Sequence, residues 1–386
     1  MDEPADYFRD LGRQVERLVP ECVELRRTLH MHPELSLSET GTAATIHSFM
    51  KSRGLSPSSL DFPSVLCDTG AEPSIALRAD MDALPVSEHS GEPFSSRNDG
   101  VMHACGHDAH SAILAGAGVL IRKRGKVNAR LIFQPGEEVG RGAKMMIDAG
   151  ALEGIGQIFG LHVWPSLDTG TVAILDGPAM AGHDEFKITV SGGGGHGAYP
   201  HLAKDTILAA SSIVTDAHWL VSRMVDPVQS AVLSFGSIQG GRAANVIPSE
   251  VTMHGTIRTF SGDVRAQLMD GLRRLCDRTA ELFGLSVGLE WQHGGPAVVN
   301  YPSFAAGARG IASSFMKTVG CNWTMGSEDF AYYLEKAKGA FAFLGTGRDA
   351  GTRASKHGSA FRLDEKAIYY GVMLEVAVAE SALKWA

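Results

Sequence analysis

Cysteine is scarce in this sequence, and long apolar runs are missing from it. Five cysteines are scattered over 386 residues, and an odd, dispersed set does not make the disulfide framework of a small secreted protein. No apolar run approaches the roughly 18–20 residues that a membrane-spanning helix needs. The N-terminus is acidic and lacks the basic and apolar regions of a signal peptide. We therefore expect a reduced, cytoplasmic protein with no membrane partner.

Positive charge is also in short supply. The 35 lysines and arginines are outnumbered by 43 aspartates and glutamates, which gives a net charge of −8. A protein that binds nucleic acid normally presents a basic face to the phosphates, so we expect no nucleic-acid partner. The apolar fraction of 44% and the charged fraction of 20% are typical of a globular protein. A chain of 386 residues exceeds the size of one hydrophobic core and predicts two domains.

Helical and strand patterns alternate at both ends of the chain. Short apolar runs that are typical of buried strands occur at residues 74–78, 130–133, 158–163 and 340–345. A strongly apolar helix is predicted at 109–122, between the first two of them. Buried strands that alternate with helices indicate an α/β fold with a mixed, largely parallel sheet. We expect this domain to be discontinuous and to consist of residues 1–183 and 296–386.

The pattern changes in residues 184–295. Strand, helix, strand, strand, helix and strand are predicted, in this order, at residues 185–190, 203–223, 230–238, 250–258, 262–283 and 286–291. The order β-α-β-β-α-β is the ferredoxin-like arrangement, a self-contained α+β unit. We therefore expect residues 184–295 to form a smaller domain inserted into the first.

The densest group of reactive side chains lies at residues 101–110 (VMHACGHDAH), with three histidines, a cysteine and an aspartate. Cys105 and His107 flank Gly106, so a thiolate and an imidazole can turn toward one point. This pair of ligand types suits zinc and its first-row neighbours. For the segment taken alone, a polar loop with a buried cysteine is the alternative.

Three further pieces place polar side chains in or after buried strands. Glu137 and Glu138 follow the strand at 130–133, and the carboxyl ends of strands are where sites form in open α/β sheets. Because adjacent glutamates point in different directions, one can bind metal while the other transfers protons. His162 lies within the next apolar strand, although a lone histidine there is more often a core residue. His357 follows the last strand and a glycine-rich loop, where a histidine is usually solvated.

Motifs along nearly the whole chain resemble one family. They occur at residues 29–34 (LHMHPE), 78–85 (RADMDALP), 102–108 (MHACGHD), 134–138 (QPGEE), 195–201 (GHGAYPH), 245–248 (NVIP) and 326–330 (GSEDF). The series resembles the aminoacylase, hippurate hydrolase and auxin-conjugate (IAA-amino acid) hydrolase branch of the dinuclear metallopeptidase-like amidohydrolases. The resemblance implies a zinc-exopeptidase-like catalytic domain with an inserted dimerisation or lid domain. It also implies cleavage of N-acyl-amino acids to a carboxylic acid and a free amino acid.

The resemblance assigns roles to residues of the catalytic domain. It implies two divalent metal ions per chain, with zinc expected and manganese, cobalt or nickel as alternatives. The implied ligands are Cys105, His107, Glu138, His162 and His357. Glu137 matches the catalytic carboxylate, the base and acid for a metal-activated water. Asp82 and Asp108 match groups that orient ligands. Relatives in other branches carry a ligating histidine where this chain has Asp80, so the role of Asp80 stays open.

The resemblance also assigns roles in the inserted domain. His196 matches a histidine that reaches across a homodimer to the partner's active site, and we expect it to stabilise the oxyanion there; whether it acts in cis or in trans stays open. Asn245 and Arg258 match residues that bind the substrate's carboxylate, although a strand arginine is more often in a surface ion pair. His30 and His32 belong to the motif series without a ligand role.

Two other functions are compatible with these residues. A dipeptidase or other exopeptidase on the same scaffold would need a site for a free α-amine. A metal-dependent binding protein would have no turnover, and an unliganded base at Glu137 argues against it. The sequence leaves open the preferred acyl group, the preferred amino acid, the native metal and any oligomeric state beyond a dimer.

Overall fold

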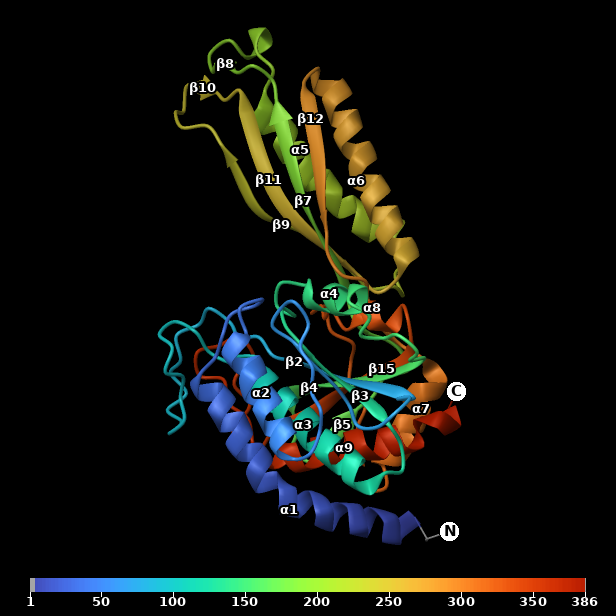
Figure 1. Ribbon diagram of the computed structural model, residues 1–386. Coiled ribbons are helices and arrows are strands. Elements are labelled where there is room, and N and C mark those ends of the chain that lie inside the picture. Colours follow the sequence, from blue (N-terminus) through green and yellow to red (C-terminus); the bar gives the residue numbers. More distant parts are fainter. Residues whose placement is uncertain (1–3, 386) are drawn as a thin grey trace. The chain divides into compact units, whose positions relative to one another are not determined.

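The computed structural model describes residues 4–385, which divide into two compact units (Figure 1). The first unit consists of Met1–Ala179, Val299–Asn322 and Asp329–Ala386, and the second of Met180–Val298 and Trp323–Glu328. The sequence places the segment Trp323–Glu328 in the first domain, but it belongs to the second unit. The reason is local, because the carbonyls of Thr324 and Gly326 both accept a hydrogen bond from the Ala181 N–H at 3.0 Å.

A seven-stranded sheet forms the centre of the first unit, in the order β1-β3-β2-β4-β15-β5-β14. Its strands are β1 (Val65–Asp68), β2 (Ile75–Asp80), β3 (Ala129–Gln134), β4 (Gln157–Asp168), β5 (Thr171–Ala173), β14 (Lys317–Thr318) and β15 (Lys338–Gly347). The central strands β3, β2, β4 and β15 are parallel. β1 runs antiparallel to β3 and β5 runs antiparallel to β15, whereas β14 is parallel to β5. The predicted mixed, largely parallel sheet is confirmed. Because β2 and β3 are parallel, their carboxyl ends, Asp80 and Gln134, lie side by side at one edge.

Helices cover this sheet. They are α1 (Pro4–Met31), α2 (Thr40–Ser52), α3 (His107–Arg124), α4 (Gly142–Asp148), α7 (Pro302–Ala312), α8 (Ala331–Leu334), α9 (Lys366–Ser381) and the 3₁₀ turn η3 (Ala382–Trp385). Helices α1, α3 and α9 pack against one another, and α3 and α9 also contact the central strands (Figure 1). Helix α3 is buried from its first residue to Ile121 except for one position, which explains its apolar composition. This burial fixes the N-terminus of α3, where the cysteine–histidine segment lies.

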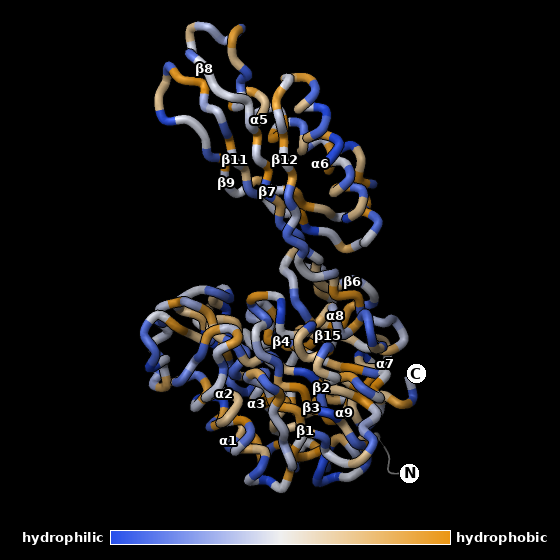
Figure 2. The backbone as a smooth tube through the Cα atoms, turned by 45° about the horizontal axis from the view of Figure 1, so that its top comes forward, coloured by the Kyte–Doolittle hydropathy of each residue, from blue (hydrophilic) through white to orange (hydrophobic). Residues whose placement is uncertain are grey.

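An antiparallel sheet of four strands, in the order β12-β7-β11-β9, forms the second unit. Its elements are β7 (Gly182–Ser191), η1 (Pro200–Leu202), α5 (Thr206–Trp219), the π-helical turn η2 (Leu220–Met224), β9 (Ala231–Gly240), β11 (Glu250–Thr259), α6 (Gly262–Phe283) and β12 (Ser286–His293). The predicted ferredoxin-like order is confirmed. Helix α6 alternates hydrophobic and hydrophilic residues along its length (Figure 2), and its apolar face packs into the core formed with α5 and the sheet.

Two short strand pairs complete the fold. β8 (Gly195–His196) pairs with β10 (Val246–Ile247) at one end of the second unit (Figure 1). β6 (Gly177–Met180) pairs with β13 (Val298–Asn300) where the chain passes from one unit to the other and back. Within residues 4–385, none of the helices combines the length and the apolar composition that a bilayer crossing requires.

Candidate metal centre

The N-terminus of α3 presents the cysteine–histidine segment to the carboxyl edge of the sheet. Gly106, which precedes the helix, has a left-handed backbone with φ 91°, and a Cβ at this position would lie 2.4 Å from Cγ2 of Val163. Only glycine allows both the conformation and the approach. The resulting turn buries Cys105 and His107 together, and the Cys105 Sγ lies 3.3 Å from Nε2 of His162 in β4.

The loop after β3 brings the paired glutamates to the same place. Oε1 of Glu138 lies 3.9 Å from Nε2 of His107 and 3.5 Å from Nε2 of His357. The Glu138 N–H donates to Oδ2 of Asp82 at 2.9 Å, which fixes the backbone of the loop. Glu137 offers a carboxylate oxygen within 4.8 Å of ligand atoms of His107 and Glu138.

His357 reaches this cluster from the loop after β15. Its backbone is left-handed, with φ 63°, which is uncommon for a residue other than glycine. The His357 N–H donates to the Ala104 carbonyl at 2.8 Å, next to Cys105, and so holds the loop against the cysteine–histidine segment. The side chain remains 53% exposed. An unusual backbone conformation held by a specific contact is typical of functional sites.

The side chains gather in overlapping groups, each with ligand atoms within 4.8 Å of one another. These groups are Cys105, His107 and His162; Cys105, Glu138 and His357; and His107, Glu137 and Glu138. Among residues 4–385, the buried atoms Nε2 of His107 and Oε1 of Glu138 have no hydrogen-bond partner. A buried polar atom without a partner is costly and calls for an explanation. Thiol, imidazole and carboxylate atoms directed at one another fit a transition-metal ion.

The protonation of the histidines suits metal binding. Burial, together with the positive charge of Lys356, holds the pKa of His162 well below its ordinary value, so its imidazole is neutral. Its Nδ1 donates to the Val163 carbonyl at 2.7 Å, which leaves the Nε2 lone pair directed toward Cys105. Burial also raises the pKa of the Cys105 thiol. A thiolate at this buried position therefore requires a positive charge beside it, such as a metal ion.

The two aspartates expected to orient ligands differ in their partners. Oδ1 of Asp82 lies 3.1 Å from Nδ1 of His107, and its other oxygen accepts from the Glu138 N–H, so Asp82 contacts two of the expected ligands. Asp108 instead accepts hydrogen bonds from Arg26 at 2.7 Å and from His30 Nδ1 at 2.8 Å. No hydrogen bond from Asp108 to an expected ligand is present among the described residues, because its side chain faces α1. Asp108 thus links the start of α3 to Arg26 and His30 of α1, which gives His30 a structural role.

Three further buried residues lie near the cluster. His110 lies one helical turn after His107, and its ring lies 5.4 Å from that of His107 and 4.6 Å from that of His162. Asp80 lies 2.6 Å from His110 Nδ1. Glu39 accepts a hydrogen bond from the Gly136 N–H at 2.8 Å, and burial raises the pKa of Glu39 to about 7. The i, i+3 spacing from His107 was the only sequence signal for His110, and Glu39 had none, because its contact is 97 residues away.

The expected residues of the inserted domain lie far apart within the second unit. Val246 pairs with His196, and the carbonyl of Asn245 accepts from the Gly197 N–H at 2.8 Å, so His196 and Asn245 are neighbours. Arg258 lies near the other end of β11 and donates to Ser327 Oγ at 3.2 Å. A strand rises about 3.4 Å per residue, so Glu250 and Arg258 are on the order of 25 Å apart. Asn245 and Arg258 of one chain therefore do not meet at one carboxylate.

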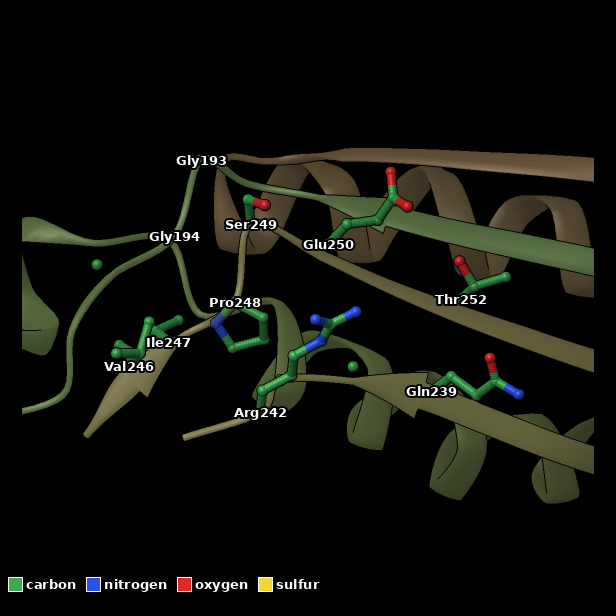
Figure 3. Close-up of a pocket in the computed structure, with 13 residues that line it drawn as sticks. Gly193, Gly194, Gln239, Arg242, Val246, Ile247, Pro248, Ser249, Glu250 and Thr252 are labelled. Atoms are coloured by element: carbon green, nitrogen blue, oxygen red, sulfur yellow. The ribbon is translucent and has the colours of Figure 1, made fainter. Parts of the chain in front are cut away.

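A cavity of about 690 Å³ lies beside the β8–β10 pair. Glycines line one side of it, and the strand ends of β9 and β11 line the other. Figure 3 shows the Arg242 side chain extending past Pro248 toward β11, with Gly193 and Gly194 across the opening. The cavity therefore adjoins the end of the second unit that carries His196 and Asn245.

A known protein family matches the part of the chain that contains the cysteine–histidine turn, the paired glutamates and the two further histidines. Residues 76–381 match peptidase family M20/M25/M40. The chain belongs to this family. It is therefore an enzyme of a hydrolase family, and the resemblance inferred from the motifs is confirmed.

Individual members of the family are similar over almost the whole chain. The N-acetyl-L-cysteine deacetylase of Bacillus subtilis is 40% identical over 362 residues, which cover 91% of this chain and 85% of that protein. Thermostable carboxypeptidase 1 of Saccharolobus solfataricus is 36% identical, and the match covers 97% and 98% of the two chains. A crystal structure described as a dinuclear metal-binding peptidase of the M20 family, from Bacillus subtilis, has a TM-score of 0.86 and 33% identity and covers 96% and 100%.

Proposed function

We propose that this protein is a metal-dependent amidohydrolase that cleaves N-acyl-amino acids to a carboxylic acid and a free amino acid. The observation that carries the proposal is the gathering of five ligand-type side chains and Glu137 between the carboxyl edge of the sheet and the start of α3. The similarity to an N-acetyl-L-cysteine deacetylase supports an N-acyl substrate.

The chain's own side chains would hold two divalent cations. The ligands are Cys105, His107, Glu138, His162 and His357. Cys105 and Glu138 each belong to two of the overlapping groups, which supports two adjacent positions rather than one. Such a pair of cations, when bound, lowers the pKa of a shared water toward neutrality and polarises the scissile carbonyl. The thiol and imidazole atoms favour zinc, with cobalt, nickel and manganese as alternatives.

Glu137 is the group that moves the proton. It takes a proton from the water that attacks the acyl carbon and then delivers this proton to the leaving amine. The loop backbone is fixed on both sides of it, since the Gly136 N–H donates to Glu39 and the Glu138 N–H donates to Asp82. A side chain on a fixed backbone needs little reorganisation during the reaction.

The substrate's carboxylate would be held by residues of two chains. Arg258 lies near the C-terminal end of β11, whereas Asn245 precedes β10 beyond its other end, so both can contact one substrate only if they come from different subunits. His196 is the neighbour of Asn245 and would enter the partner's site with it, where it would stabilise the oxyanion. A C2 homodimer makes this exchange reciprocal.

An exopeptidase is the competing function, because a thermostable carboxypeptidase is also similar over 97% of the chain. The deciding assay compares acetyl-, benzoyl- and indoleacetyl-amino acids with free dipeptides, using protein loaded in turn with zinc, manganese, cobalt and nickel. Faster turnover of the N-acyl-amino acids supports the proposal. Faster turnover of dipeptides would favour the exopeptidase, and metal binding without any turnover would favour a binding protein.

Mixing two inactive variants tests the shared site. Glu137→Ala and His196→Ala subunits are combined after reversible dissociation. Random pairing makes half of the dimers mixed, and in a mixed dimer one site carries both lesions and the other carries neither. Activity should therefore recover to roughly a quarter of the wild-type value. With subunit exchange verified by a mass label, an absence of recovery would place His196 in its own chain's site or outside catalysis.

A further inference from the structure

His110 is a buried histidine whose two ring nitrogens are both engaged. The ring is 1% exposed, its Nδ1 lies 2.6 Å from Oδ1 of Asp80, and its Nε2 lies 2.9 Å from the backbone nitrogen of Val163. A backbone N–H can only donate, so Nε2 of His110 is the acceptor and carries no proton. The proton of the neutral ring is therefore on Nδ1 and is donated to Asp80. The tautomer of His110 follows from these two contacts.

The peptide that His110 holds is the one that orients His162. The Val163 N–H donates to His110, and the Val163 carbonyl accepts from Nδ1 of His162 at 2.7 Å. The ring of His110 also packs edge-on against the ring of His162, with centroids 4.6 Å apart and an interplanar angle of 70°. The direction of Nε2 of His162, which lies 3.3 Å from Cys105 Sγ, thus depends on His110 through a hydrogen bond and a ring contact.

Asp80 is itself fixed behind His110. Its Oδ1 accepts from His110, and its Oδ2 accepts from Arg78 at 2.9 Å, in a position with no solvent exposure. Oδ2 of Asp80 lies 3.8 Å from Nε2 of His107, which is beyond hydrogen-bond distance. Arg78 and His110 therefore fix the orientation of the Asp80 carboxylate without a contribution from a metal ion.

We propose that Asp80 and His110 form a positioning pair for the ligand His162: Asp80 accepts the Nδ1 hydrogen of His110 and holds its ring, and His110 fixes the Val163 peptide and the His162 ring. The inference rests on the proposed metal centre, and it gives Asp80 a role other than that of a ligand. Atoms of Asp80, His107 and His110 also lie within 4.8 Å of one another and could hold an ion themselves. The contacts of His110 favour positioning, because Nδ1 carries a proton that it donates to Asp80 and the lone pair of Nε2 accepts from the Val163 N–H, so no lone pair is left for a metal.

The test measures metal binding and the metal's spectrum as well as activity. His110→Leu replaces the ring by an apolar side chain of similar volume and removes both hydrogen bonds. His110→Gln retains a donor and an acceptor. Ser111→Ala is the matched control, since it removes a hydrogen bond from α3 to the Asp80 backbone carbonyl without touching His110 or His162. Each protein is titrated with cobalt against a competing chelator, and the thiolate-to-cobalt charge-transfer band and the ligand-field bands are recorded.

His110→Leu should bind one of its two cobalt ions about 10–100-fold more weakly, the usual effect of losing a group that orients a ligand. The charge-transfer band of that ion should shift, His110→Gln should recover part of both effects, and Ser111→Ala should match the wild type. Unchanged affinities and spectrum in His110→Leu would overturn the inference. So would a third cobalt ion in the wild type that His110→Leu lacks, since His110 would then be a ligand.

Three outcomes separate this inference from its alternatives. If His110→Leu does not fold, as judged by the thermal unfolding of the metal-free protein, Asp80→Ala, which removes the acceptor for His110 Nδ1, is measured in its place, and an unchanged spectrum in that variant overturns the pair. If wild-type protein binds no cobalt at all, the proposed metal centre itself is wrong. If the wild type binds two ions and the variant binds them identically, only the positioning role fails.

Discussion

Replacing each of the adjacent glutamates by glutamine should separate proton transfer from metal binding. Oε1 of Glu138 is buried, lies 3.5 Å from His357 Nε2 and 3.9 Å from His107 Nε2, and has no hydrogen-bond partner among residues 4–385. Its carboxylate is therefore directed at the ligands. Glu137 lies next to it on a backbone held from both sides. We expect Glu137→Gln to remove the base and Glu138→Gln to remove a ligand.

The expected magnitudes differ in kind. Loss of a general acid–base group costs roughly 10²–10⁴-fold in kcat, or about 2.7–5.4 kcal/mol of transition-state stabilisation at about 1.36 kcal/mol per tenfold. Glu137→Gln should show this loss with an unchanged metal content and an unchanged KM. Glu138→Gln replaces an anionic ligand by a neutral amide, so metal affinity should fall by roughly tenfold or more, about 1.4 kcal/mol or more.

The assay combines metal analysis of gel-filtered protein with steady-state kinetics on one N-acyl-amino acid. Excess metal should restore much of the activity of Glu138→Gln and none of that of Glu137→Gln. The amide keeps the size of the carboxylate, so thermal unfolding of the two metal-free variants should match the wild type and exclude misfolding. Metal loss in Glu137→Gln together with intact metal in Glu138→Gln would refute the assignment of base and ligand.

Three other predictions concern the metal, the substrate and a buried carboxyl group. A chelator should abolish hydrolysis and added metal restore it, and Cys105→Ser should weaken metal binding, since an alcohol is a poorer ligand than a thiolate; full activity of metal-free protein would contradict the mechanism. Arg258→Ala should raise KM by about 10–100-fold for an N-acyl-amino acid and little for its amide, from about 1–3 kcal/mol per lost charged hydrogen bond; equal wild-type turnover of acid and amide would exclude carboxylate anchoring. Burial raises the pKa of Glu375 well above the 4.5 of the unfolded chain, so stability is lost as pH rises above that value, by up to about 1.4 kcal/mol per pH unit, until the folded carboxyl also ionises. Glu375→Gln should therefore melt increasingly above the wild type as pH rises from about 5 to 8, and a difference independent of pH would contradict this.

The elements that carry the site could be predicted because their patterns are local. The buried strand β3 ends just before the glutamates, and the apolar helix α3 begins at His107, so both follow from apolar runs and a glycine. The short antiparallel strands β1 and β5 could not be predicted in this way. They are four and three residues long, and their pairing depends on distant segments rather than on their own composition.

The contacts that orient the ligands could not be predicted from the sequence either, because they join residues that are far apart along the chain. Asp82 pairs with His107 across 25 positions, and Glu39 holds Gly136 across 97. Asp108 shows the converse case. It is adjacent to an expected ligand in sequence, but successive residues of a helix point about 100° apart, so its side chain faces Arg26 and His30. Adjacency in a motif therefore predicts a shared element but not a shared direction.

Asn245 and Arg258 are a second case in which sequence motifs do not predict spatial proximity, and here the consequence concerns the dimer. The family resemblance assigns both residues to one substrate carboxylate, but the sequence motifs give no distance between them. The register of β11 with β7 and β9 places Glu250 and Thr259 at opposite ends of the sheet. Either one of the two does not bind the carboxylate, or each substrate is held by two chains. Mixing Arg258→Ala with Asn245→Ala subunits distinguishes these cases. If two chains hold each substrate, each variant is impaired alone and mixed dimers regain one intact centre, so about a quarter of the wild-type activity returns. If one of the two residues does not bind the carboxylate, its alanine variant keeps the wild-type activity without mixing.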